Sequence, residues 1–542
     1  MKKIKLRILA LLLALSLLLT GCGLVDFGGY FAALKSLMGG GTMVPFSGMI
    51  YERPDMAAIR AELDKAISAS ESEENTVESV AEAIYAFYDA YDWFYTCYSL
   101  ADIHYCTDLT DIYWEKEYSY CLENSGTVDA MLEELYYALA KSPLREELEG
   151  EEYFGPGYFD SYEGENLWDE TFVALLEQEA QLQDRYYELS GKALDQVPGT
   201  EEYYDVCAGD MAQLLVELIR LRQQIADYWG YEDYVRFAGD FYYYREYTPE
   251  DMAAYLQEIQ LELVDVYRGL TEQDWEAASQ YCQEKETFAY VRTAAENMGG
   301  TVWEAFQLME DAGLYDISYG PNKYDASFEV YLTSYWEPFV FVNPTMSRYD
   351  CLTFAHEFGH FCNDYASYGT YAGVDVTEVF SQGMEYLSLC YGEDTQDLAR
   401  LKLADSLSVY VEQAAYAAFE QKMYALEGDD LTVENLYALY ESVAESYGFD
   451  SVAYDPREFV TITHFYTNPL YVISYVVSND AAMQLYQLEQ ETAGAGLALL
   501  EENLDTQANY FLEFLDSAGL ESPFAPGRLT QVRETFEEIF GK

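Results

Sequence analysis

The chain has 542 residues, of which 97 are acidic and 29 are basic, and its formal charge is −68. A surface this negative repels nucleic acid and anionic lipid headgroups, and it favours metal ions or cationic peptides as partners. Half of the residues are hydrophobic and 16% are aromatic, which excludes a disordered chain and allows a large core in one bilobed unit or two domains.

Residues 1–21 have the pattern of a lipoprotein signal peptide. Basic side chains precede an apolar stretch over residues 8–19, and the segment from Leu19 to Cys22 (LTGC) has the form of a lipobox. The apolar stretch is shorter than the roughly 20 residues of a spanning helix. We therefore expect an extracytoplasmic protein that an acylated Cys22 holds on the lipid bilayer of the bacterial cell, with residues 22–50 as a flexible tether.

Residues 54–313 show hydrophobic positions three and four apart, the spacing of amphipathic helices. The pattern is clearest over residues 80–100, 127–140, 175–194 and 210–229. It predicts a helical N-terminal lobe over residues 51–325. Eight cysteines besides Cys22 lie at irregular spacings without a CxxC pair, which indicates buried thiols rather than a disulfide framework.

The pattern changes after residue 325. Residues 328–332 and 339–342 are rich in β-branched and aromatic side chains and are predicted to be strands. We expect residues 339–343 to form an edge strand that can pair with an extended peptide. A helix is predicted to start at residues 347–350, and helical periodicity then continues through a second lobe, residues 326–542.

The first helix of this second lobe contains the sequence His356-Glu357-Phe358-Gly359-His360. Side chains four residues apart share one face of a helix, so both imidazoles can bind one metal ion while Glu357 reaches a bound water. Zinc fits this arrangement best. With four histidines in the chain, roughly 0.005 such matches are expected by chance. The alternative is a helix with two buried histidines that bond to neighbouring side chains.

A catalytic zinc site needs a third protein ligand and an open position for water. The carboxylates that follow the motif are Asp364, Asp375, Glu378 and Glu385. Glu378, in the first turn of the next predicted helix, is the predicted third ligand, although it could instead close a capping box with Asp375. Asp375 and Glu385 are candidates to accept a hydrogen bond from a ligand imidazole, or they are surface acids.

The motif, together with residues 375–385 (DVTEVFSQGME), resembles the thimet oligopeptidase and oligoendopeptidase F family. In that family the glutamate that matches Glu378 is the third zinc ligand. Residues 462–475 (ITHFYTNPLYVISY) resemble the family segment in which a histidine and a later tyrosine face the zinc. The resemblance implies this role for His464 and Tyr471, with Tyr466 and Tyr475 as alternatives to the tyrosine.

The resemblance also implies a mainly α fold, with two helical lobes around a deep channel and a small β-sheet beside the active-site helix. Residues 326–542 would then be the catalytic lobe of a zinc endopeptidase for short unstructured peptides, with Glu357 as the general base. Many relatives have histidine where this chain has Asn363, and proline where it has Phe380. The alternatives are a catalytically inert peptide-binding lipoprotein and a zinc exopeptidase.

Overall fold

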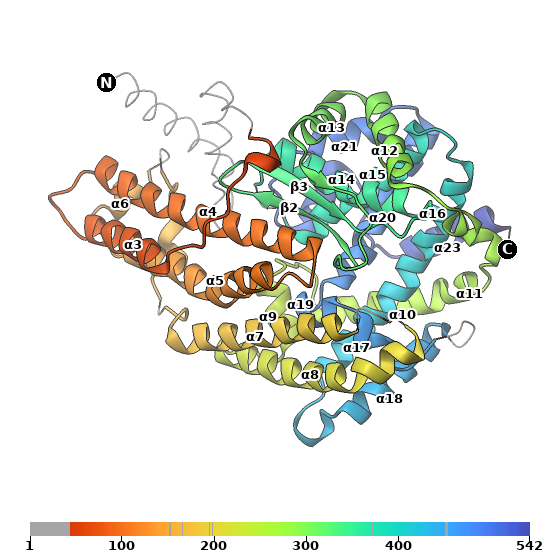
Figure 1. The fold of residues 1–542 in the computed structure, drawn as a ribbon, viewed down its shortest axis with the longest axis horizontal. Coiled ribbons are helices and arrows are strands. Elements are labelled where there is room, and N and C mark those ends of the chain that lie inside the picture. The colour runs from red at the N-terminus through yellow and green to blue at the C-terminus, as the bar shows by residue number, and fades with distance from the viewer. Residues whose placement is uncertain are drawn as a thin grey trace.

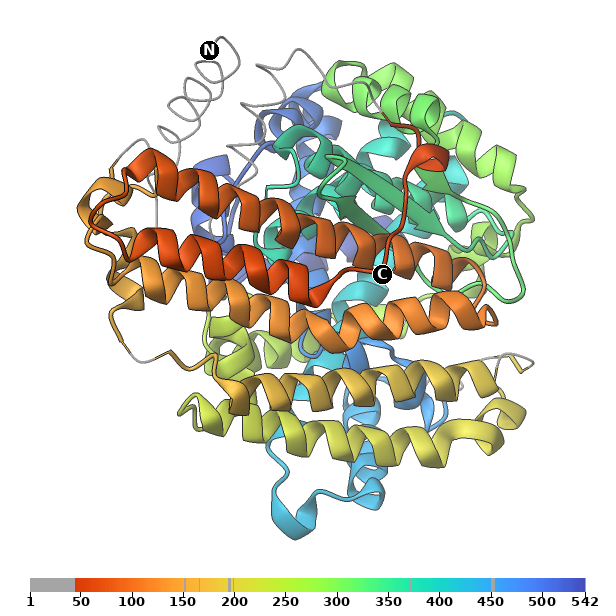
Figure 2. The same ribbon diagram turned by 60° about the vertical axis from the view of Figure 1, so that its left-hand side comes forward.

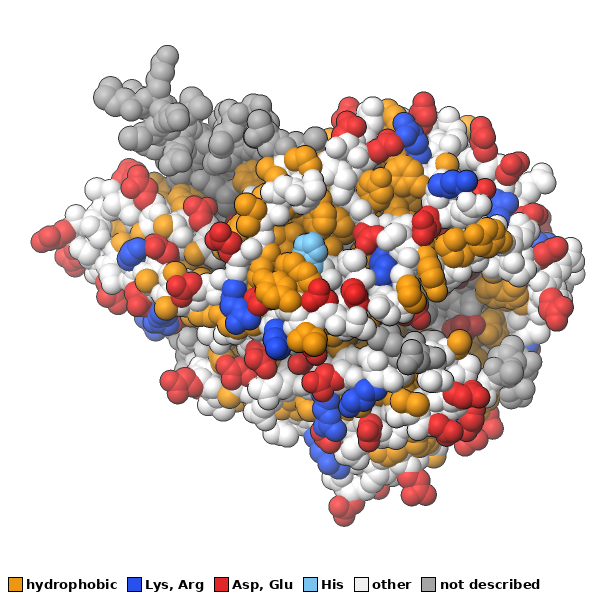
Figure 3. All heavy atoms as spheres, viewed as in Figure 1, with side chains coloured by type: hydrophobic (Ala, Val, Ile, Leu, Met, Phe, Trp, Pro, Cys, Tyr) orange, Lys and Arg blue, Asp and Glu red, His pale blue; other side chains and the backbone are white. Residues whose placement is uncertain are grey.

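The computed structural model describes residues 44–541, apart from residues 151–152, 165, 194–195, 198, 371 and 450–453. The predicted signal peptide, Cys22 and residues 23–43 of the predicted tether lie outside the described residues. Among the described residues, no helix combines the length and the apolar character that crossing a bilayer requires. Acidic side chains are spread over the face seen in Figure 3, in keeping with the net charge of −68.

The fold is mainly helical with one small sheet, as predicted, and it begins with three long helices that lie side by side (Figures 1 and 2). These are α3 (Met56–Ser70), α4 (Val77–Thr107) and α5 (Ile112–Leu139). The carboxylate of Asp55 and the hydroxyl of Thr76 accept the free backbone N–H groups at two of their starts. Buried side chains from Ile59 to Phe159 give these helices a core cluster of their own.

More helices follow before the sheet, and they include the predicted segments 175–194 and 210–229. They are α6 (Arg145–Leu148), α7 (Glu170–Lys192), α8 (Glu201–Tyr228), α9 (Tyr234–Phe241), α10 (Pro249–Glu262), α11 (Val264–Tyr267), α12 (Glu284–Met298) and α13 (Gly300–Ala312). The largest core cluster runs from Leu100 to Phe536 and so crosses residue 325. Hydrophobic packing therefore continues across the predicted boundary at this residue, which lies among the strands of the sheet. Seven of the eight cysteines are buried free thiols, and Cys390 is partly exposed.

The sheet has the order β1-β3-β2, which corrects one prediction. β3 (Glu337–Val342) pairs with β1 (Tyr315–Asp316) on one side and with β2 (Ser327–Leu332) on the other. The expectation that residues 339–343 form an edge strand is therefore wrong, because β3 is central and fully buried. Its unbroken hydrophobic run is typical of an interior strand. The outer strands are β1 and β2, and the residues of β2 are mostly half-buried.

The helices after the sheet carry the sequence motifs. They are α14 (Asp350–Ser367), α15 (Val374–Tyr391), α16 (Gln396–Ser408), α17 (Ala414–Tyr424), α18 (Val433–Ser446), α19 (His464–Thr467), α20 (Val472–Glu491), α21 (Ala495–Asn503), α22 (Phe511–Ala518) and α23 (Arg528–Phe540). α14 begins at Asp350, whose carboxylate accepts the N–H of Ser347 at 3.0 Å. The predicted serine and acid are therefore both at the helix start.

Gly359 allows α14 and α15 to approach each other closely. A Cβ atom at this position would lie 2.6 Å from both the carbonyl oxygen of Phe380 and the Cα of Ser381. Both contacts are with the backbone of α15, so neither can move aside as a flexible side chain would. The glycine inside the motif therefore sets the distance between the two helices that carry the predicted metal ligands.

We expect Gly359→Ala to lower the free energy of unfolding by about 1–3 kcal/mol, because the added methyl group overpacks the interface between α14 and α15. Gly209→Ala is the matched control, since Gly209 is an exposed residue of α8 whose added Cβ would meet no atom within 4 Å. That substitution should raise stability by about 0.5–1 kcal/mol. Thermal or denaturant unfolding measures both, and equal stability of the two variants would refute the tight contact.

Candidate metal centre and active site

The structure brings the three predicted metal ligands together. His356 and His360 lie one turn apart on α14, and Glu378 faces them from the first turn of α15. The Nε2 atom of His356 lies 3.4 Å from Oε2 of Glu378, and Nε2 of His360 lies 3.7 Å from Oε1 of the same carboxylate. One ligand atom from each side chain lies within 4.8 Å of the other two.

This geometry fits a zinc ion. Ligand atoms about 2.0–2.1 Å from a tetrahedral zinc lie roughly 3.4 Å apart, close to the two distances between the imidazoles and the carboxylate. The side chain of Glu378 is 1% exposed, whereas those of His356 and His360 are 18% and 16% exposed. All three residues line one cavity, so an ion held by them would be reachable from it.

Glu357 follows the first predicted ligand and lines the same cavity. Burial, together with the nearby carboxylates of Glu378 and Glu385, raises the pKa of its carboxyl group to about 7 against the lowering effect of His356. A general base works best when its pKa is near the working pH. The environment of Glu357 therefore suits the proton transfers that the motif predicts for it.

Glu385 lies beside a ligand imidazole, as one of its two predicted roles requires. Its Oε1 atom accepts a hydrogen bond from Nδ1 of His356 at 2.9 Å. Its Oε2 atom lies 2.7 Å from Nζ of Lys402, a buried residue of α16 that the sequence analysis missed. Burial by itself lowers the pKa of Lys402, but its carboxylate partners raise it above the ordinary value for lysine.

Asp375 does not contact a ligand imidazole, so the expectation that it orients one is wrong. Its carboxylate accepts hydrogen bonds from the Tyr247 hydroxyl at 2.6 Å and from Ser474, and it pairs with Arg245 at 3.3 Å. These partners lie on the chain before the sheet and on α20. Asp375 therefore fixes the start of α15 in the core.

Two further side chains hold the carboxylate of Glu378. The hydroxyl of Tyr471 donates to Oε1 at 2.6 Å, and the hydroxyl of Ser381 donates to Oε2 at 2.9 Å. Hydrogen bonds of this kind orient a metal-binding carboxylate before the ion arrives. Tyr471, the tyrosine that we predict to face the zinc, is thus placed at the metal centre and lines the cavity.

His464 and Tyr475 form a second pair of donors in the cavity. Nε2 of His464 lies 3.2 Å from the Tyr475 hydroxyl. Burial lowers the pKa of His464 to about 4, so its imidazole is neutral at pH 7 and can donate through one N–H. Tyr466 points elsewhere, because its hydroxyl donates to the carbonyl of Met211 at 3.3 Å.

A buried arginine positions the segment that carries His464. Arg222 of α8 is fully buried and pairs with Glu179 at 2.6 Å. It also donates to the carbonyl oxygens of Phe465, at 2.7 Å, and Tyr466, at 2.5 Å. The N-terminal helices therefore hold α19, and with it His464, against the predicted catalytic residues of the second lobe.

The cavity has a volume of about 880 Å³ and is bounded by β2, by α14 and α15, and by the segment from Thr461 to Tyr475. Several carboxyl groups line it, among them Glu329 and Asp364. Burial raises the pKa of Asp364 to about 7, and this residue lies beside Glu329 rather than with the metal ligands. Among the described residues that line the cavity, none is lysine or arginine.

We expect Tyr471→Phe to lower kcat by about 10²–10³-fold, the usual effect of removing one hydrogen-bond donor to an oxyanion. Tyr466→Phe is the control, since that hydroxyl bonds outside the cavity and its loss should leave kcat unchanged. Steady-state kinetics of both variants and of Tyr475→Phe measure the effect. A loss confined to Tyr475→Phe would contradict the role of Tyr471 and give it to Tyr475.

A mainly helical fold with a His-Glu-x-x-His helix and a facing glutamate is the arrangement expected of a metal-dependent peptidase. Residues 46–166 match the family model described as the Peptidase M3 N-terminal domain. No match was found among proteins of curated function.

Solved structures share this fold over nearly the whole chain. A structure assigned to oligoendopeptidase F has a TM-score of 0.80 and 21% identity, over 92% of this chain and 99% of that one. Pz peptidase A with an inhibitor has a TM-score of 0.79 and 19% identity, over 92% and 99%. A structure from Bacillus anthracis strain Ames assigned to oligoendopeptidase F gives 0.77 and 20%, over 92% and 98%. The resemblance to the oligoendopeptidase F family is therefore confirmed in the fold, which is that of these peptidases.

Proposed function

We propose that this chain is a zinc-dependent oligoendopeptidase that hydrolyses internal bonds of short unstructured peptides at the bacterial cell surface. The observation that carries the proposal is the convergence of His356, His360 and Glu378 in one cavity, with Glu357 beside them. The family match and the shared fold support it.

In the proposed mechanism, each residue of the site has a separate role in peptide hydrolysis. A zinc ion bound by the three ligands would polarise the scissile carbonyl group and the attacking water. Glu357 takes a proton from the water as the new C–O bond forms, and it gives the proton to the leaving amine as the C–N bond breaks. His464 donates a hydrogen bond to the oxyanion that develops in between. Tyr471 donates a second one when its single O–H turns from Glu378 to the oxyanion, as it can once that carboxylate binds the metal ion.

The outer strand β2 supports the proposed preference for unstructured peptides. Ser327, Phe328, Glu329 and Tyr331 of this strand line the cavity. An extended peptide can add to an outer strand through main-chain hydrogen bonds, whereas a folded domain does not offer a free strand to a cavity wall. We therefore assign to β2 the pairing with an extended peptide that we expected of residues 339–343.

The cell-surface location rests on the sequence around Cys22. Wild-type protein expressed in a bacterium that processes lipoproteins should incorporate labelled palmitate and fractionate with the membrane. Cys22→Ala should take up no label and accumulate with its signal peptide uncut. A labelled Cys22→Ala protein, or an unlabelled wild type, would contradict the lipid anchor.

The endopeptidase activity can be tested with one peptide in two forms, blocked at both ends and free at both ends. The protein should cut both forms at the same internal bond with similar kcat/KM, and mass spectrometry of the products identifies that bond. Trimming of the free form alone would show an exopeptidase. A protein that binds zinc and cuts neither form would be an inert peptide binder.

A further inference from the structure

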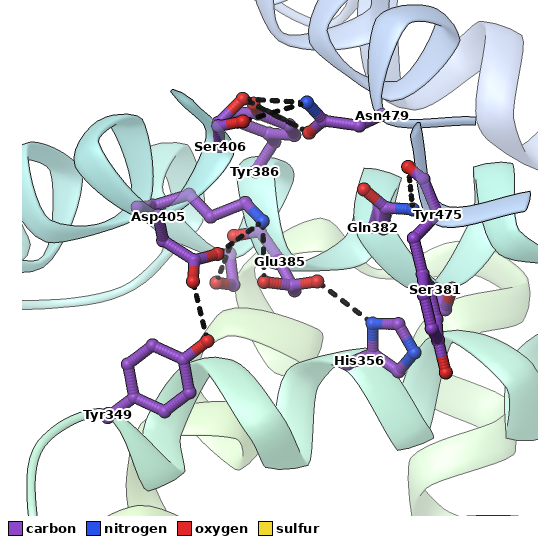
Figure 4. Close-up of polar contacts among 12 residues, drawn as sticks. Tyr349, His356, Ser381, Gln382, Glu385, Tyr386, Asp405, Ser406, Tyr475 and Asn479 are labelled. Atoms are coloured by element: carbon purple, nitrogen blue, oxygen red, sulfur yellow. Dashed lines mark hydrogen bonds and ion pairs between the residues drawn. The ribbon is translucent and has the colours of Figure 1, made fainter. Parts of the chain in front are cut away.

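Lys402 lies in a buried chain of polar contacts behind the metal centre. Its side chain is 1% exposed, and Nζ lies 2.7 Å from Oε2 of Glu385 and 3.3 Å from Oδ2 of Asp405. The Tyr349 hydroxyl donates to the other oxygen of Asp405 at 2.6 Å. Figure 4 shows these contacts running from Tyr349 and Asp405 to Glu385 and His356.

The two oxygens of Glu385 bond to different groups. Oε2 accepts from Lys402, and Oε1 accepts from Nδ1 of His356 at 2.9 Å. A carboxylate held at one oxygen cannot rotate freely about its last bond, so the ammonium group also sets the direction of the other oxygen. With the proton fixed on Nδ1 of His356, the lone pair of Nε2 faces Glu378 and is available to a metal ion.

Stability alone does not account for a lysine at this position. A buried ion pair seldom stabilises a fold more than well-packed hydrophobic residues of similar volume do. Nζ also lies 4.9 Å from the ring centroid of Tyr386, which is a cation–π contact. The contact that distinguishes Lys402 is its bond to Glu385, which is itself bonded to a predicted metal ligand.

We propose that Lys402 is a positioning residue of the metal centre: by holding Oε2 of Glu385, it fixes the ring and the tautomer of His356. This inference rests on the proposed zinc-dependent function. It assigns a role to a residue about 40 positions beyond the motif, on a helix that contributes no metal ligand. Asp405 also pairs with the ammonium group, and the Tyr349 hydroxyl in turn holds the carboxylate of Asp405.

The role predicts a loss of metal affinity that depends on Glu385. Replacing a group that orients a metal ligand typically weakens metal binding about 10–100-fold. Lys402→Met should therefore weaken zinc binding by about that factor, change the visible spectrum of the cobalt-substituted protein, and lower kcat with KM nearly unchanged. Glu385→Gln should also weaken zinc binding, because its amide cannot accept from both Lys402 and His356.

A double-mutant cycle separates positioning from a general effect on folding. If Lys402 acts through Glu385, the double variant K402M/E385Q should bind zinc no more weakly than Glu385→Gln alone. The double variant removes one positive and one negative group, so the net charge of the buried cluster is unchanged. If Lys402→Met does not fold, zinc binding can therefore still be compared between the double variant and Glu385→Gln. Arg528→Met is the control, because Arg528 is also buried and pairs with Asp480 at 2.9 Å. It should lower stability and leave zinc affinity unchanged.

Zinc dissociation constants from chelator competition, measured on the mature chain, decide the matter. The role of Lys402 would be overturned if Lys402→Met bound zinc as tightly as the wild type. It would also be overturned if the fold-loss of zinc affinity in the double variant equalled the product of the fold-losses in the two single variants. A wild type that binds zinc and cuts no peptide would instead refute the proposed activity, and the comparison of affinities would stand.

Discussion

Glu357→Gln is expected to lower kcat for peptide cleavage by about 10²–10⁴-fold, the usual contribution of a positioned general base. Glutamine keeps the size and one acceptor oxygen of the side chain but cannot take up the proton of the attacking water. The neighbouring ligands are untouched, so the variant should still bind one zinc ion. Steady-state kinetics and metal analysis of the same preparation measure both properties.

Glu420→Gln is the matched control for this substitution. Glu420 is fully buried, and burial raises the pKa of its carboxyl group to about 8, so it is protonated at pH 7 and resembles glutamine. Its Oε1 atom accepts the N–H of Leu470, a bond that the amide oxygen can keep. Activity of wild-type level in Glu357→Gln would show that another group acts as the base.

Glu378→Gln should have the second large effect, through the metal. The carboxylate is 1% exposed and lies 3.4 Å and 3.7 Å from the two imidazoles, so it would supply the negative ligand of the proposed zinc site. A neutral amide is a poor zinc ligand, and the lost polarisation of the carbonyl group and water is worth several kcal/mol, or about 10³-fold in rate. We therefore expect little bound zinc after gel filtration and a matching loss of activity.

The response of activity to added zinc distinguishes Glu378→Gln from Glu357→Gln. Added zinc should restore part of the activity of Glu378→Gln, because the two histidines remain, whereas it should restore none in Glu357→Gln. Full zinc occupancy together with wild-type activity in Glu378→Gln would remove this residue from the predicted ligand set and leave the third position to another group.

Local spacing explains why much of the site could be predicted from the sequence. The i, i+4 histidines share a helix face wherever that helix lies, and the glutamate between them follows from the same geometry. Glu378 required one more step, namely that the next helix packs against the first. Gly359, whose missing side chain permits that packing, was part of the motif but gave no sign of its role.

Residues whose partners are distant in sequence could not be predicted. Asp375 and Glu385 both follow the motif within about 30 residues, yet only Glu385 reaches a ligand imidazole. Asp375 bonds to Arg245 and Tyr247, which lie about 130 positions earlier in the chain. No local sequence pattern indicates that contact. Lys402 is one lysine on a helix, and only its burial beside Glu385 shows what it does.

The order of the strands and the choice among the three tyrosines could not be predicted for the same reason. The sequence predicts two strands but not that β1 pairs with the far side of β3, although the continuous hydrophobic run of β3 is a hint of an interior position. Tyr466, Tyr471 and Tyr475 lie on both sides of a turn in which Leu470 has a positive φ of 64°. That turn directs Tyr466 into the core and the other two into the cavity.

Cleavage of an internally quenched, end-blocked peptide tests the proposed metal-dependent endopeptidase activity most directly. The protein is first stripped with a chelator, and activity is recorded before and after one equivalent of zinc is returned. We predict no cleavage by the stripped protein and full recovery with zinc. Cleavage that persists without metal, or none after zinc is bound, would contradict the claim.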